Sequence, residues 1–207
     1  MLRTTTYRAN TPALSMSISC PLEWPKDTSI QVQLKVTYIE DPSGKGRPFT
    51  FHVTAFTSKF SQHSHHEGFY VYQDRYGAWK LYIDEDANPG FAIWDAPPIP
   101  VMVGDAGTYD SSFMTLGPGE SWTCTHYAQS LSDSILPYEA RAGDRFLYRN
   151  KGAVVDWWDW GTKEDHKQTA VKLCCVVGCD LEEPKDNGGR PKLVVPGSNE
   201  VVFTYVG

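Results

Sequence analysis

The chain has 207 residues, of which 41% are hydrophobic and 21% are charged. This balance is typical of a soluble globular protein, and roughly 70% of the unfolded surface is buried at such a length, so no metal or disulfide staple is required for folding. The net charge of −6 comes from 25 acidic and 19 basic residues without a Lys/Arg cluster, which argues against nucleic acid as a partner.

Alternating hydrophobic patterns predict strands early in the chain, after a polar arm formed by residues 1–13. Residues 14–20 and 30–39 carry apolar side chains at every second position, which indicates strands with one buried and one solvated face. The predicted buried faces hold Leu14, Met16, Ile18 and Cys20 in the first segment and Ile30, Val32, Leu34, Val36 and Tyr38 in the second. A third strand-like run contains Phe49, Phe51, Val53 and Phe56.

Turn residues separate the predicted strands in the middle of the chain. Residues 69–72 and 79–83 are predicted to form a hairpin around a turn at residues 74–77, and residues 91–95 form a short apolar run. Pro118 and Gly119 lie between two alternating runs, and this pair has the residue types that a type II turn requires.

The last third of the chain continues the pattern. Strands are predicted at residues 145–149, at residues 171–177 and on either side of residues 196–199, and a short helix is allowed within residues 128–143. A single turn of helix is predicted from Thr162, with Asp165 as an imperfect capping box. About ten short strands with turns between them predict an all-β protein, a single immunoglobulin-like antiparallel β-sandwich spanning residues 14–207.

Four segments carry a resemblance to a known family. LSMSISC, IQVQLKVTY, FAIWD and LGPGES resemble the immunoglobulin-like N-terminal domain of fungal deuterolysin-type metalloproteases, and also small protease-inhibitor sandwiches of related fold. The resemblance covers residues 14–149 and implies a sandwich fold. It carries no functional residues, and because the chain lacks an HExxH motif, it does not imply protease activity.

No segment has the features of a signal peptide or the ~20 apolar residues of a transmembrane helix. We therefore expect a soluble, cytoplasmic protein without a membrane partner. The five cysteines are not spaced as in a secreted disulfide scaffold, and we expect buried or half-buried free thiols. Three of them, Cys174, Cys175 and Cys179, are crowded together, and the first two would face opposite sides of a strand, so that pair cannot clamp one ion.

The segment QHSHHEG holds a candidate metal site. On a strand, His63 and His65 would project to the same side and His66 to the other, and imidazole pairs of this kind bind metals on β scaffolds. A catalytic site would need a further ligand, for which His126 and His166 are the candidates. The ion would be zinc or copper.

The segment DWWDWG, residues 156–161, is a candidate ligand site. If it is extended, Asp156, Trp158 and Trp160 share one face, while Trp157 and Asp159 share the other. A two-layer sandwich buries only one face of a strand, so we expect one or two indoles at a surface, at a pocket rim or under a covering loop. Exposed aromatic rings beside carboxylates suit sugar stacking or an apolar small molecule.

Two classes of function remain open from the sequence. The first is a non-catalytic binding module, without a cofactor, for a protein partner or a small apolar or sugar-like ligand. Its site would be Trp157, Trp158, Trp160, Asp156 and Asp159. The second is a small metal-dependent enzyme that uses the histidine cluster. A β-sandwich hosts either class, so the predicted fold does not choose between them.

Overall fold

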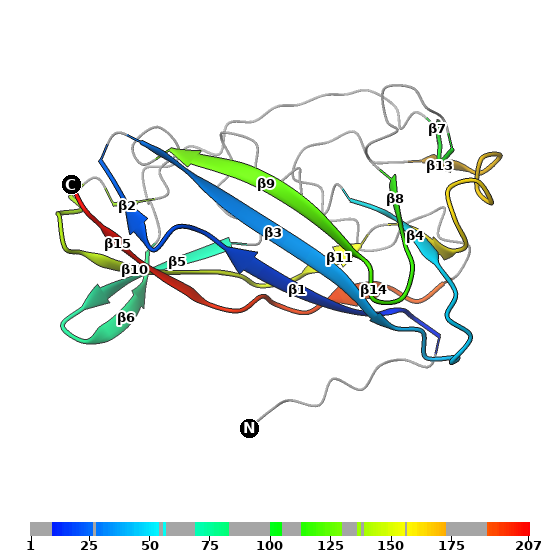
Figure 1. The fold of residues 1–207 in the computed structure, drawn as a ribbon, viewed down its shortest axis with the longest axis horizontal. Coiled ribbons are helices and arrows are strands. Elements are labelled where there is room, and N and C mark those ends of the chain that lie inside the picture. The colour runs from blue at the N-terminus through cyan, green and yellow to red at the C-terminus, as the bar shows by residue number, and fades with distance from the viewer. Residues whose placement is uncertain are drawn as a thin grey trace.

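Figure 1 shows the protein as a computed structural model built almost entirely of strands and loops. The structure describes residues 10–26, 28–53, 56, 69–82, 100–104, 113–129, 136–137, 139–155, 157–172 and 190–207. The strands are β1 (Ala13–Ser19), β2 (Glu23–Trp24), β3 (Ser29–Glu40), β4 (Phe49–His52), β5 (Phe69–Arg75), β6 (Ala78–Leu81), β7 (Pro100–Met102), β8 (Phe113–Leu116), β9 (Ser121–Gln129), β10 (Arg145–Asn150), β11 (Ala153–Val155), β12 (Trp158–Trp160), β13 (Ala170–Lys172), β14 (Leu193–Val195) and β15 (Val201–Tyr205).

One layer of the protein is the antiparallel sheet β1-β3-β9. Apolar side chains at every second position of β3 are buried and the polar residues between them are mostly exposed, because neighbouring residues of a strand point to opposite sides. In β1 the same alternation buries Leu14, Met16 and Ile18. The buried faces predicted for both strands are confirmed, with Cys20 half-buried at the end of the series.

The second layer is the sheet β2-β15-β10-β5-β6, in which only the β2–β15 pair is parallel. Its inward side chains include Phe146 of β10, stacked on Phe203 of β15 at 5.6 Å, and Phe203 also contacts Trp24 at 5.5 Å. These rings belong to the same hydrophobic core as the inward residues of β1 and β3. Two sheets therefore enclose one main core, and the predicted all-β sandwich is confirmed.

Three shorter sheets, β12-β4-β8, β11-β14 and β13-β7, complete the described strands. Figure 1 shows β4, β8, β7 and β13 at the end of the molecule opposite the β5–β6 hairpin. A second, smaller hydrophobic cluster lies among these sheets and consists of Val101, Val103, Phe113, Trp157 and Val171. All four residues of β4 are buried, so both faces of this strand are covered.

The predicted turn at Pro118 and Gly119 has the expected geometry. Gly119 has a φ of 83°, and the Glu120 N–H donates to the Gly117 carbonyl at 3.0 Å, which completes the type II turn. Residues 163–168, which follow Thr162, form turns and not a regular helix. The predicted capping interaction is nevertheless present, because the Thr162 N–H and hydroxyl both donate to Asp165 Oδ2 at 2.8 Å. This interaction lowers the pKa of the Asp165 carboxyl.

The β5–β6 hairpin is tighter than the sequence predicts. Its two central residues, Tyr76 and Gly77, have positive φ angles of 58° and 81°, as in a type I′ turn. The apolar run at residues 91–95 lies outside the described residues. The described residues of the segment considered for a helix, 128–129, 136–137 and 139–143, are strand, bend, turn or irregular and not helical, and the others lie outside. No helix in the described part of the chain is long and apolar enough to cross a membrane.

Candidate functional site

The DWWDWG segment lies at the boundary between the two hydrophobic clusters. Strand β12 pairs with β4, with Trp158 opposite Phe51 and Trp160 opposite Phe49. Trp158 points into the main core, whereas Trp157 points to the other side and belongs to the second cluster. The predicted division of this segment into two faces is confirmed for its described residues, and Asp156 lies outside them.

Both central indoles are buried, each with an exposed fraction of 1%. Trp158 Nε1 donates to the Pro191 carbonyl at 3.0 Å. Trp157 contacts the ring of Phe113 at 5.5 Å and that of His166 at 5.6 Å. Because a second cluster covers the face that a simple two-layer sandwich leaves open, these two indoles present no ring face to a ligand in this structure.

Trp160 is half-buried, and an arginine covers its ring. The Arg47 guanidinium lies 3.7 Å from the ring centroid, which is cation–π contact. The same guanidinium donates to both carboxylate oxygens of Asp41, at 3.0 and 2.9 Å. Hydrogen bonds from Arg47 and Ser43 hold the pKa of the buried Asp41 carboxyl well below its usual range.

A second arginine, Arg190, forms an ion pair with the carboxylate of Asp159 in the DWWDWG segment. Asp159 is paired with Arg190 at 3.0 Å, and Arg190 Nε donates to the Trp158 carbonyl at 2.6 Å. Partial burial lowers the pKa of Arg190, and the charge of Asp159 opposes that shift. The Trp160 ring and the Asp159 carboxylate are thus both in contact with protein groups, and a ligand role for the motif stays a prediction.

The histidines of the predicted metal site are not brought together by any described part of the structure. His63, His65 and His66 lie outside the described residues. His166 is buried, with Nε2 at 2.9 Å from the Trp160 carbonyl and Nδ1 at 3.5 Å from Thr169 Oγ1, so both ring nitrogens face protein groups. No group of three or more His, Cys, Asp or Glu side chains suited to a metal occurs among the described residues.

Two of the five cysteines, Cys20 and Cys124, lie among the described residues. Both are free and half-buried, as predicted, and burial raises the pKa of each thiol, that of Cys20 to about 11. Since the thiolate is the reactive form, these two cysteines are suited to packing and not to nucleophilic chemistry. Cys174, Cys175 and Cys179 lie outside the described residues.

The outward side of the second sheet holds a group of residues that the sequence analysis did not identify. We call it the arginine–aromatic face. It consists of Tyr70 and Tyr72 of β5, Trp79 and Leu81 of β6, and Arg145, Leu147 and Arg149 of β10. Cross-strand register places Tyr72 between Leu147 and Leu81, and Tyr70 opposite Arg149.

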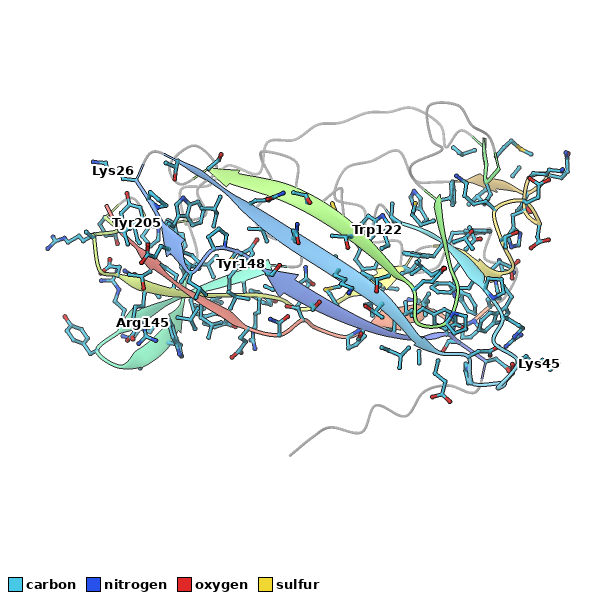
Figure 2. The ribbon with its side chains drawn as sticks, in the orientation of Figure 1. Lys26, Lys45, Trp122, Arg145, Tyr148 and Tyr205 are labelled. Carbon is cyan, nitrogen blue, oxygen red and sulfur yellow. The ribbon has the colours of Figure 1, made fainter. Side chains whose placement is uncertain are left out.

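The arginines of this face stack on its aromatic rings. The Arg149 guanidinium lies 4.9 Å from the Tyr72 ring and 5.9 Å from that of Tyr70, and the Arg145 guanidinium lies 5.6 Å from Trp79. Each arginine also forms an ion pair, Arg145 with Asp74 at 3.4 Å and Arg149 with Glu200 at 3.3 Å. Figure 2 shows Arg145 at the end of the sheet that carries the β5–β6 hairpin. The arginine side chains are therefore held in place while they remain partly exposed.

Apolar surface is concentrated on the same face. Trp79 and Leu81 are exposed at 38% and 42%, and the adjacent Tyr76 at the hairpin tip is fully exposed. Leu147, in contrast, is only 5% exposed although it points away from the core, because side chains of neighbouring strands surround it. The signal was present in the sequence. Arg145 and Arg149 of RFLYRN are four residues apart and so share one face of a strand, and the two tyrosines of YVY are two residues apart and also share one face.

No family model matches the chain, and no curated protein matches it. Among solved structures, the chain is similar to the CARDB domain of a Pyrococcus furiosus protein, solved in complex with di-metal ions. The identity is 13% and the TM-score is 0.31, with 100% of this chain and 98% of that chain covered. A TM-score this low supports no inference about function, and the resemblance to the deuterolysin-type N-terminal domain stays a prediction.

Proposed function

We propose that this protein is a non-catalytic binding module and that a protein partner docks on its arginine–aromatic face. The observation that carries the proposal is the ordered stacking of Arg145 on Trp79 and of Arg149 on Tyr72 on an outward sheet surface. Tyrosine, tryptophan and arginine are the residues that contribute most energy to protein–protein interfaces.

Two physical features favour a protein over a small ligand. The face lies on the pleated surface of a sheet, whereas a small molecule needs a concave site that surrounds most of its area. In addition, the ion pairs with Asp74 and Glu200 restrict the arginine side chains before binding, which lowers the entropy lost when a partner orders them.

The small apolar or sugar-like ligand expected from the sequence has less support. Its most accessible indole would be Trp160, whose ring is already covered by Arg47. The metal-dependent enzyme rests on His63, His65 and His66, and metal analysis of the purified protein together with the variant H63A/H65A tests it directly. If the purified protein holds no transition metal, and the H63A/H65A variant has the same metal content as the wild type, the enzyme proposal is contradicted.

The proposed function is tested by screening for ligands and asking whether the face is required. A phage-displayed library of random linear peptides and a carbohydrate array are probed with the wild type, with Tyr72→Ala/Arg149→Ala, and with Val154→Ala/Val194→Ala as a control. The control pair is also exposed and apolar but lies on the separate β11–β14 sheet. We expect peptide ligands that the face variant loses and the control keeps. Ligands retained by the face variant, carbohydrate ligands alone, or no ligand at all would contradict the proposal.

A further inference from the structure

We propose that the partner adds an extended segment as a new strand to the edge of β6, with acidic residues alternating with apolar ones. This inference rests on the proposed function and specifies its partner. The observation behind it is that β6 pairs with β5 on one side only in the described structure, and all four of its residues are exposed. An unpaired strand edge presents a row of amide donors and carbonyl acceptors, which an extended chain can pair with.

The register of the hairpin identifies the backbone groups that are available. The Tyr82 N–H donates to the Val71 carbonyl at 2.8 Å, so this pair of residues is hydrogen-bonded across the hairpin. Hydrogen-bonded and non-hydrogen-bonded pairs alternate along an antiparallel ladder. Leu81 and Trp79 therefore stand in non-hydrogen-bonded pairs with Tyr72 and Asp74, and their N–H and C=O groups point away from β5.

The side chains of β6 define what the added strand should carry. Trp79 and Leu81 project onto the arginine–aromatic face, where they offer apolar surface to every second residue of an incoming strand. Lys80 projects to the opposite side, is exposed, and has no carboxylate partner among the described residues. An incoming strand with apolar residues on the first side and carboxylates on the second would complement both.

The same lysine disfavours a second copy of this chain as the occupant. If β6 of one molecule paired antiparallel with β6 of another, with Trp79 opposite Leu81, the two Lys80 side chains would lie directly opposite each other. Like charges at directly opposed positions destabilise a strand pair. An acidic strand from a different protein meets no such repulsion.

The substitution Leu81→Pro tests the strand addition. Proline removes the outward N–H of residue 81 and no hydrogen bond within the hairpin, and an edge strand accepts proline at such a position. Leu81→Ala is the matched control, since it removes the side chain and keeps the donor. Circular dichroism and thermal unfolding establish that both variants are folded.

The probes are peptides selected from the library and resynthesised with single N-methyl groups along the backbone. We expect N-methylation at every second peptide residue to weaken binding about tenfold, the effect of losing one hydrogen bond, and methylation between them to have little effect. Leu81→Pro should weaken binding about tenfold relative to Leu81→Ala. Lys80→Glu should weaken binding of peptides rich in carboxylates and leave the fold unchanged.

The outcomes separate this inference from the proposed function. In one outcome, peptides fail to bind Tyr72→Ala/Arg149→Ala, bind Leu81→Pro and Leu81→Ala equally, and show no alternating effect of N-methylation. This outcome would overturn strand addition but would still support the arginine–aromatic face as the binding surface. Peptides that the face variant retains, but that Leu81→Pro loses, would support the strand edge and contradict the arginine–aromatic face. Concentration-dependent dimerisation of the wild type that Leu81→Pro abolishes would identify a second copy as the occupant and overturn the acidic partner strand.

Discussion

Two regions of this protein stack arginine on aromatic rings, and they differ in what surrounds the stack. At the DWWDWG segment, Arg47 covers Trp160 and is paired with Asp41, whose side chain is only 1% exposed. On the arginine–aromatic face, Arg149 covers Tyr72 and is paired with Glu200, whose side chain is 54% exposed. The first arrangement holds a loop onto the fold, whereas the second presents its groups to solvent. A contact between arginine and an aromatic ring therefore does not identify a binding site. Whether the groups around that contact are buried or exposed distinguishes a structural role from a binding role.

The largest expected difference between the two regions is the effect of deleting an indole. Trp158→Ala leaves a cavity in the main core and should lower the free energy of unfolding by about 4 kcal/mol. Trp79→Ala, on the exposed face, should lower it by about 1 kcal/mol or less. Urea denaturation followed by circular dichroism measures both. Equal losses would show that the two regions do not differ in their structural role.

The second prediction concerns the buried carboxylate. Asp41→Asn removes a partner of Arg47 and should lower the free energy of unfolding by about 2 kcal/mol at neutral pH, less than for a fully buried pair because Arg47 is 33% exposed. The pKa of Asp41 is lower in the folded state than in the unfolded state, so its stabilising contribution is present above the unfolded pKa of about 4. The contribution declines as the pH falls below that value.

We therefore expect the difference in the free energy of unfolding between the wild type and D41N, measured by denaturation over a pH series, to become smaller at acidic pH. Asp74→Asn, which removes the half-buried carboxylate paired with the exposed Arg145, is the matched control and should change the free energy of unfolding by about 0.5 kcal/mol or less. If the difference between the wild type and D41N stayed constant from neutral to acidic pH, the ion pair between Arg47 and Asp41 would be contradicted.

The third prediction compares how salt affects the ion pairs of the two regions. A double-mutant cycle of Arg149→Ala and Glu200→Ala should give a coupling energy of about 0.5 kcal/mol that about 1 M NaCl largely removes, because exposed charges are screened. The corresponding cycle of Arg47→Ala and Asp41→Ala should keep most of its larger coupling energy at the same salt concentration. The same loss in both cycles would mean that Asp41 is accessible to solvent ions.

The smallest expected effect is on tryptophan fluorescence. Iodide quenches exposed indoles, so Trp79→Phe should remove a larger part of the quenchable emission than Trp157→Phe or Trp158→Phe, whose indoles are buried. Stern–Volmer plots of the three variants measure this difference. A greater loss of quenching in either variant of the DWWDWG segment would place an indole of that segment at the surface.

Much of the strand pattern could be predicted because side-chain direction along a strand is a local property. The alternation in residues 30–39 predicted which side chains of β3 are buried, and residue types alone predicted the turn at Pro118 and Gly119. The same rule placed Trp157 and Trp158 on opposite faces.

What the local rule did not determine is whether a given face is covered. Trp157 is buried because Val101, Val103, Phe113 and Val171, which come from three separate strand regions of the chain, pack around it. In the same way, the pairing of Arg149 with Tyr72 depends on the register between β10 and β5, because these two residues are 77 positions apart in the sequence. Strand periodicity is encoded in neighbouring residues, whereas burial and cross-strand register depend on long-range packing. For this reason the sequence alone predicted many of the strands and their two faces, and only the tertiary structure distinguished the buried aromatic cluster from the exposed one.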